Sequence, residues 1–155
     1  MYAIITENDV SQWDDDTGVI YHFPKRYQKY LATGTKVIYY KGKIKDKKYS
    51  AARQSDKPHY FGIATIGEVY PDKNSSKGDL FALIEEYQGF KQAVIAKTDN
   101  GYYEIIPDNK KTNYWRDGVR YSNKSVYDKI VSDSAIEQKP KIQNNNLNDL
   151  DNCLE

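Results

Sequence analysis

Aromatic and basic side chains occur together along residues 19–41, which read VIYHFPKRYQKYLATGTKVIYYK. Tyr21, His22 and Phe23 end one predicted strand, and Tyr40 lies near the end of the next. Aromatic rings stack on nucleobases, and lysine and arginine neutralise phosphates. Having both kinds of side chain within one strand–helix–strand unit therefore points to nucleic-acid binding.

Eight side chains are candidates for a pocket that holds a base: Trp13, Asp15, Tyr21, His22, Phe23, Tyr40, Tyr60 and Trp115. Side chains alternate between the two faces of a strand, so Tyr21 and Phe23 share a face that excludes His22. An exposed tryptophan such as Trp13 is costly unless it packs or binds, and the Asp15 carboxylate can accept a hydrogen bond from an exocyclic amine.

Most of these residues also have a purely structural interpretation. The core is the favoured place for Phe23, a hydrogen-bonding role in a turn is favoured for Asp15, and a lone histidine such as His22 is more often structural. Trp115 can instead close the bottom of a barrel. One of the neighbours at positions 39 and 40 is expected in the core and the other at the surface, and positions 59 and 60 are expected at the pocket rim.

The net charge of +1 hides a strongly basic block. Residues 1–19 carry a charge of −5, residues 20–60 carry +9, residues 61–132 balance, and residues 133–155 carry −3. Local field rather than net charge governs the capture of a polyanion. The candidate phosphate-binding residues are Lys25, Arg26, Lys41, Lys43, Lys45, Lys47, Lys48, Arg53, Arg116 and Arg120. A simple solvated lysine loop is the alternative for residues 41–57.

The sequence gives no support for an enzyme, a metal-binding protein or a membrane protein. It has two histidines and one cysteine, Cys153, and it lacks the zinc-deaminase, HNH and D-x-x-x-E-x-K nuclease patterns. We therefore expect no catalytic residue, metal or cofactor in this chain. No apolar run reaches the length of a membrane span, and no signal peptide is evident, so we expect a cytoplasmic protein.

Mixed α and β elements must position these residues. Strands are predicted at 2–6, 19–23, 35–41, 59–70, 90–96 and 101–106, and helices at 24–31 and 126–131, the second with Ser125 as its N-cap. Residues 79–87 fit either a helix or a strand. Short, glycine-punctuated strands predict an α+β fold: a small, curved, mostly antiparallel β-barrel flanked by a few short helices. Residues 1–132 form the predicted domain, and 133–155 form a disordered polar tail or a linker to an absent domain.

The order of motifs resembles a known family. The pieces are residues 15–18, Tyr21-His22-Phe23-Pro24, the G-x-x-V-x-Y-Y strand at 34–40, the Y-F-G-x-A-x-I strand at 60–66, and W-R-x-G-V-R-Y-S at 115–122. Over residues 13–131 the chain resembles the PUA-like modules, related to EVE and YTH domains, that precede HNH nuclease domains in modification-dependent bacterial restriction endonucleases.

The resemblance implies a barrel whose concave aromatic pocket accepts a modified base. It implies a non-catalytic module that reads modified double-stranded DNA by taking a flipped base into the pocket and targets a restriction nuclease to that DNA. Extruding a base costs a few kcal/mol, which stacking and phosphate contacts must offset. Two alternatives stay open: an RNA-binding PUA/YTH-like domain, and a protein-interaction or small-ligand β-barrel.

Overall fold

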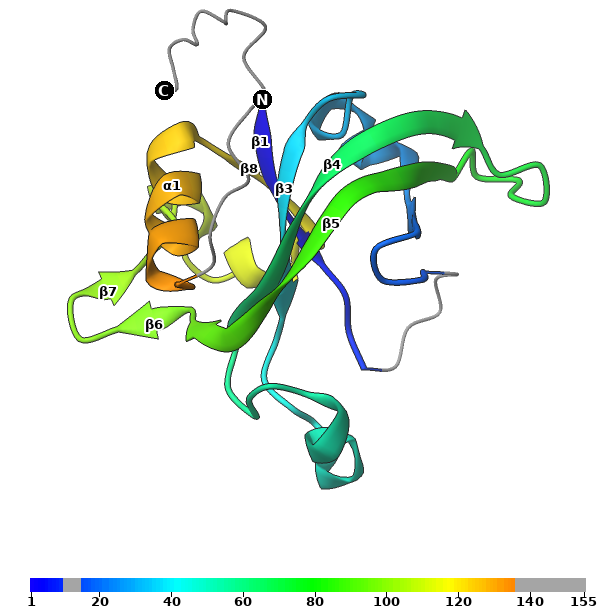
Figure 1. Cartoon of the computed structure of the whole chain (residues 1–155). Coiled ribbons are helices and arrows are strands. Elements are labelled where there is room, and N and C mark those ends of the chain that lie inside the picture. Colours follow the sequence, from blue (N-terminus) through cyan, green and yellow to red (C-terminus); the bar gives the residue numbers. More distant parts are fainter. Residues whose placement is uncertain (10–14, 136–155) are drawn as a thin grey trace, which may run out of the picture.

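The structure, a computed structural model, describes residues 1–9 and 15–135, and its main feature is a strongly curled six-stranded sheet (Figure 1). The strand order is β2-β5-β4-β3-β1-β8, so β2 and β8 form the two edges. The strands are β1 (Tyr2–Thr6), β2 (Ile20–Phe23), β3 (Lys36–Lys41), β4 (His59–Pro71), β5 (Leu80–Ile95) and β8 (Val119–Ser122). A small hairpin of β6 (Lys97–Thr98) and β7 (Gly101–Tyr102) follows β5.

Pairing within the sheet is antiparallel except between β1 and β3, which run parallel. The predicted α+β fold with a curved, mostly antiparallel sheet and few helices is confirmed, as a half-barrel (Figure 1). Because β1 and β3 are parallel, their last residues, Thr6 and Lys41, lie at the same end of the two strands, and the loops that follow them start side by side.

The long strands β4 and β5 form the centre of the curl. Their pairing shifts register at three places, and such bulges bend and twist a sheet locally. At one of them Gly62 leaves a slot for the Tyr87 ring, since a Cβ built on Gly62 would lie 2.8 Å from Tyr87 Cε1. Residues 80–84 are strand because Leu80, Ala82 and Ile84 are buried while the residues between them are not; β5 then continues to Ile95 as one strand.

Two core clusters lie on opposite faces of the sheet. One contains Leu31 and Tyr27, from the 3₁₀ helix η1 (Lys25–Tyr30) and the residue after it, and the other contains the buried face of helix α1 (Lys124–Asp133). The chain also has 3₁₀ turns η2 (Lys47–Ala52), η3 (Asp108–Lys110) and η4 (Tyr114–Arg116). No helix within residues 1–9 and 15–135 is long and apolar enough to cross a membrane.

Some local predictions are wrong. The segment 24–31 forms a 3₁₀ rather than an α-helix, only Gly101–Tyr102 of segment 101–106 is strand, and β8 was not predicted. The N-cap of α1 is Asn123, whose Oδ1 accepts from the Val126 N–H at 2.9 Å, so Ser125 is not the cap. Of the tail predicted at residues 133–155, the structure describes only residues 133–135, in which Ser134 is 3% exposed, and residues 136–155 lie outside the described residues.

Candidate nucleic-acid interface

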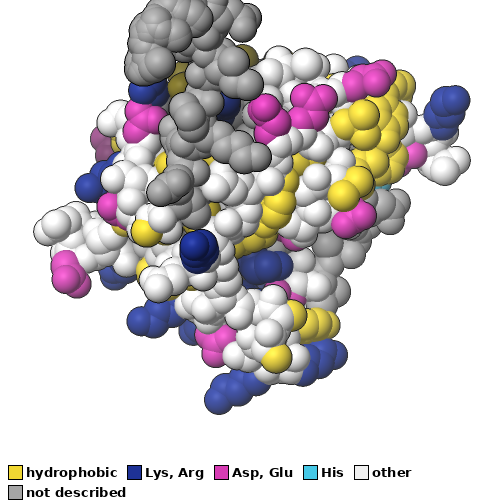
Figure 2. Space-filling view, viewed as in Figure 1, with side chains coloured by type: hydrophobic (Ala, Val, Ile, Leu, Met, Phe, Trp, Pro, Cys, Tyr) yellow, Lys and Arg dark blue, Asp and Glu magenta, His cyan; other side chains and the backbone are white. Residues whose placement is uncertain are grey.

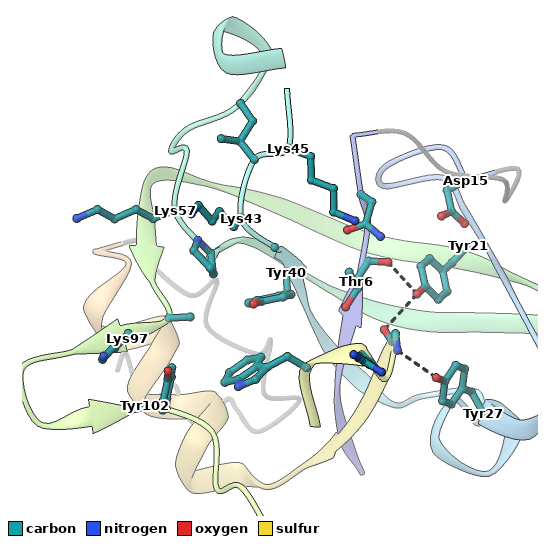
Figure 3. A pocket seen from close by; sticks show the side chains of 18 of the residues that line it. Thr6, Asp15, Tyr21, Tyr27, Tyr40, Lys43, Lys45, Lys57, Lys97 and Tyr102 are labelled. Carbon is teal, nitrogen blue, oxygen red and sulfur yellow. Dashed lines mark hydrogen bonds between the residues drawn. The ribbon is translucent and has the colours of Figure 1, made fainter. Parts of the chain in front are cut away.

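A pocket of about 1020 Å³ opens where β1 and β3 end, beside the loop of residues 42–58 (Figure 3). Its lining comes from segments far apart in the sequence: the ends of β1, β3 and β5, the starts of β2 and η1, both ends of the 42–58 loop, the β6–β7 hairpin, and residues 115–118. Its volume is at the upper end of the range of small-molecule sites, about 300–1,000 Å³.

Aromatic rings form one side of the pocket. Tyr40 stacks on Trp115 with ring centroids 5.5 Å apart and planes at 26°, and Tyr102 lies against Trp115 at 5.2 Å and 48°. Tyr40 is 5% exposed and therefore rigid, whereas Tyr102 is 46% exposed. Burial raises the pKa of Tyr40 to about 12, so its phenol is neutral at physiological pH and keeps its proton as a hydrogen-bond donor.

A buried ion pair supports these rings from behind. The Arg120 guanidinium lies 4.5 Å from the Tyr40 ring centroid and 4.9 Å from that of Trp115. Its Nε and Nη2 donate to the Glu104 carboxylate at 2.7 and 2.9 Å, and the hydroxyls of Tyr60 and Tyr114 donate to the same carboxylate at 2.6 and 2.7 Å. This paired group holds the aromatic side of the pocket in one arrangement.

The opposite side of the pocket is polar. The Tyr21 hydroxyl donates to the Thr6 carbonyl at 3.0 Å, and the Tyr27 hydroxyl accepts from the Gly118 N–H at 3.1 Å (Figure 3). These bonds connect β2 and η1 to the end of β1 and the start of β8. The Asp15 carboxylate accepts from the His22 backbone N–H at 2.6 Å. Phenol, carboxylate and backbone groups thus lie across the pocket from the stacked rings.

Exposed cations surround the pocket: Arg26, Lys43, Lys45, Lys57, Lys97 and Arg116. Asp15 is the one acidic residue among the described lining residues, and Glu7, Asp9 and Asp16 line an adjoining hollow that shares Asp15. At the pocket itself the lysines and arginines therefore outnumber the described acids. Figure 2 shows Lys and Arg side chains around the lower end of the molecule, where the 42–58 loop projects in Figure 1. This excess of positive charge attracts a polyanion.

Internal bonds hold both ends of the 42–58 loop, while its lysines Lys43, Lys45, Lys47, Lys48 and Lys57 are exposed. The Arg53 side chain, 2% exposed, pairs with Asp9 at 2.7 Å and donates to the carbonyls of Gly42 and Ser55. Lys41 Nζ lies 3.4 Å from the other Asp9 carboxylate oxygen. These internal bonds fix both ends of the loop, and they place Lys43 and Lys57 at the pocket.

The structure brings together part of the predicted site. The predicted residues that line the pocket are Asp15, Tyr21, His22, Tyr40, Trp115, Arg26, Lys43, Lys45 and Arg116. Lys25, Lys47 and Lys48 are exposed but lie outside the lining. Trp13 lies outside the described residues. The role of each lining residue in binding stays a prediction.

Several predicted site residues lie outside the pocket lining. Phe23 is 1% exposed and lies in the core, the place favoured for it. Tyr60 and His59, expected at the pocket rim, are instead fully buried, because β4 lies between β3 and β5. Tyr39 and Tyr40 are both buried, not one exposed. The Arg120 and Arg53 side chains pair with Glu104 and Asp9, and Lys41 contacts Asp9 and the Glu7 carbonyl. None of these three cations is among the lining residues, and their roles in phosphate binding stay predictions.

Among the lining residues that sequence reasoning did not predict are two tyrosines and two lysines: Tyr27, Tyr102, Lys57 and Lys97. The Asp-Asn-Gly turn at 99–101 signals a hairpin, and a hairpin directly after a strand could have drawn attention to Lys97 and Tyr102 on its two arms. Within residues 1–9 and 15–135, no group of three or more His, Cys, Asp or Glu side chains is placed to hold a metal ion.

No protein-family model and no curated protein matches this chain. Among solved structures, a Pseudomonas putida protein aligns with a TM-score of 0.53 at 14% identity, covering 86% of this chain and 99% of that one. The N-terminal domain of Staphylothermus marinus McrB aligns with a TM-score of 0.50 at 15% identity, covering 84% and 93%. Human THYN1, solved in complex with DNA containing 5-methylcytosine, aligns with a TM-score of 0.49 at 13% identity, covering 88% and 99%.

At these identities, the first two likenesses show a shared fold and nothing further. That fold is the expected one, a curled, mostly antiparallel mixed sheet with few short helices.

Proposed function

We propose that this chain is a non-catalytic DNA-binding module that holds a modified base, turned out of the duplex, in the pocket beside the 42–58 loop. One arrangement supports this function above all: stacked Tyr40 and Trp115 rings face polar groups across a pocket surrounded by six exposed cations. A base needs a surface to stack on and groups that bond to its edge, and its backbone needs positive charge.

The pocket meets each requirement with different residues. Tyr102 and Trp115 offer aromatic surface for the base, and stacking on such rings is worth about 1–3 kcal/mol per base. Asp15 and Tyr21 lie on the polar side, where a base edge would meet a carboxylate acceptor and a phenol. A close-fitting pocket senses one added methyl group by its shape, so this design suits a modified base that is turned out of the stack.

Charge distinguishes this proposal from the protein-interaction or small-ligand alternative. An aromatic cage for a cationic ligand would not have a buried arginine 4.9 Å from the ring centroid of Trp115 and six further cations around it. Neutral bases on an anionic backbone suit this field. The RNA-binding alternative uses the same surface, and sensitivity to a 2′-hydroxyl separates the two.

The proposed role in a larger system is targeting. A module of this kind brings a nuclease, in another domain or subunit, to modified DNA. The fold likeness to the N-terminal domain of McrB and the motif resemblance to modules of restriction endonucleases support this assignment.

Competition binding at moderate salt tests the proposal. Matched duplexes carry cytosine, methylcytosine, hydroxymethylcytosine or methyladenine, and a plain and a methylated single-stranded RNA serve as comparators. We expect at least tenfold preference for one modified duplex, equal to about 1.4 kcal/mol. Equal weak binding to every probe refutes base reading, and tighter binding to RNA refutes the DNA assignment.

Variants assign the two parts of the pocket. Replacing Tyr102 with Ala should reduce the preference for the modified duplex, since the stacking surface is lost. Replacing Lys43 and Lys45 with Ala should weaken binding to all duplexes alike and flatten the dependence of affinity on salt. The matched control replaces Lys47 and Lys48, which are also exposed but lie outside the pocket lining; an equal effect of both pairs contradicts a specific role for the rim.

A further inference from the structure

A second hollow, of about 460 Å³, lies along the edge strand β8, between η1 and the segment 104–117. It is separate from the base pocket but shares two lining residues with it, Arg26 and Tyr27. The two pockets are therefore adjacent, and η1 contributes to both. Nothing in the proposed reading of the base uses this second hollow.

Two tyrosines, Tyr121 and the half-buried Tyr30, give the second hollow a stacking surface. Tyr121 is 61% exposed on β8, and its ring lies 6.4 Å from that of Tyr30 with the planes at 45°. Ile105, at 71% exposed, lines the same hollow. Ile105 and Tyr121 are the most exposed large hydrophobic side chains of the described residues, and both line this hollow. Apolar side chains gathered in one place, rather than scattered singly, mark an interaction surface.

Cations lie directly beside these rings. Lys29 Nζ is 5.1 Å from the centroid of the Tyr30 ring, and Arg26 Cζ is 4.8 Å from that of Tyr27. The acids of the hollow are already paired: Glu104 with Arg120, and Asp117 with Lys110 at 2.9 Å. Lys29 and Arg26 are exposed, so the hollow combines aromatic faces with uncompensated positive charge, the combination that binds single-stranded nucleic acid.

We propose that the second hollow binds the nucleotide next to the extruded one, with its base on Tyr121 and the connecting phosphate between Arg26 and Lys29. This proposal rests on the proposed function of the first pocket. Arg26 connects the two pockets, because a nucleic-acid strand that leaves the first pocket past this side chain enters the second. The module then reads a base together with its neighbour, so flanking sequence contributes to its affinity.

An extended peptide is the competing occupant, because β8 is the edge of the sheet and an edge strand can pair with another chain. Charge and continuity with the first pocket favour the nucleic acid. The two occupants differ in what they predict for oligonucleotide binding, so one experiment separates them.

The experiment uses the preferred modified duplex and copies of it with an abasic site immediately 5′ or 3′ of the modified base. For the unaltered protein we expect one of the two abasic copies to bind about tenfold more weakly. Tyr121→Ala should bind the intact duplex about tenfold more weakly than the unaltered protein does, and the abasic site should not lower the affinity of this variant further. Tyr121→Phe should keep the aromatic ring and the affinity. Val19→Ala, which changes a side chain that is 55% exposed and lines neither pocket, is the matched control.

Each outcome decides between the proposals. If the unaltered protein prefers the modified duplex but neither the abasic sites nor Tyr121→Ala changes affinity, the flanking-nucleotide site is refuted while the base pocket stands, and the β8 edge is left for a peptide. If no modified duplex is preferred at all, the base pocket itself is refuted and the flanking site falls with it. Lys29→Gln gives a second check, since it should weaken binding and reduce the salt dependence without touching a ring.

Discussion

Neutralising Glu104 should destabilise the protein far more than neutralising a surface carboxylate. Glu104 and Arg120 are 5% and 3% exposed, and the Glu104 carboxylate accepts two hydrogen bonds from Arg120 and one each from Tyr60 and Tyr114. Glu104→Gln keeps the shape but leaves the guanidinium buried without a counter-charge. Removing one partner of a buried pair costs about 3–5 kcal/mol.

That loss is a large part of a typical total stability of about 5–15 kcal/mol. Urea unfolding followed by tryptophan fluorescence measures it, with the free energy of unfolding extrapolated to water. The control is Asp128→Asn, which makes the same chemical change in the exposed pair with Lys124, where the two side chains are 49% and 72% exposed. An exposed pair of this spacing contributes only about 0.3–0.5 kcal/mol.

A Glu104→Gln variant that unfolds within 1 kcal/mol of the unaltered protein would refute this view of the buried pair. A second readout concerns the pocket. Because the Arg120 guanidinium lies 4.9 Å from the Trp115 ring centroid, the Trp115 environment should change in the variant that still folds. A stability loss with unchanged fluorescence and unchanged ligand binding would show that the pair holds the core but not the aromatic side of the pocket.

Three further predictions follow from local geometry. Gly62→Ala should cost about 1–3 kcal/mol, because its Cβ would lie 2.8 Å from Tyr87 Cε1 and 3.1 Å from the Gln88 carbonyl, while Gly42→Ala, with no atom within 4 Å, should be nearly neutral in the same unfolding assay. Burial raises the pKa of Tyr40 and Tyr127 to about 12. Unfolded tyrosine ionises near pH 10, so the contribution of these two groups to the free energy of unfolding is complete below about pH 10. It is lost as the pH rises to about 12, by about 1.4 kcal/mol per pH unit for each group. If phenolate absorbance rose near pH 10 for every tyrosine, before the protein unfolds, this prediction would be wrong. Asn123→Ala should remove the cap of α1 and cost about 1 kcal/mol, whereas Ser125→Ala should change the midpoint of thermal unfolding little, and the reverse ranking would restore Ser125 as the cap.

Local pattern was enough to predict much of the sheet. The β-branched and aromatic residues at 35–41 predict a strand, and β3 occupies Lys36–Lys41. The alternating burial of Leu80, Ala82 and Ile84 decides between helix and strand for a segment whose apolar run fits both. The strand β8 was missed because its four residues, VRYS, form a run too short and too polar to stand out from the chain around it.

The motifs and the basic block also came from sequence alone. The aromatic and basic unit at 19–41 pointed to a nucleic-acid interface, and Tyr40 and Arg26 do line the pocket. Charge and aromatic content are properties of the chain itself, so they can be read without knowing which segments meet.

The tertiary structure alone decided which of these side chains are available. Arg53 looks like its lysine neighbours in sequence, but it pairs with Asp9, 44 residues away, and Arg120 is buried against Glu104. Tyr40 meets Trp115 only because the turn at Tyr114–Arg116 folds back against β3. The sequence determined the kinds of side chain and the strands that carry them. Folding determined which cations pair with internal acids and which face the pocket, because burial and pairing depend on segments that lie far apart in the sequence.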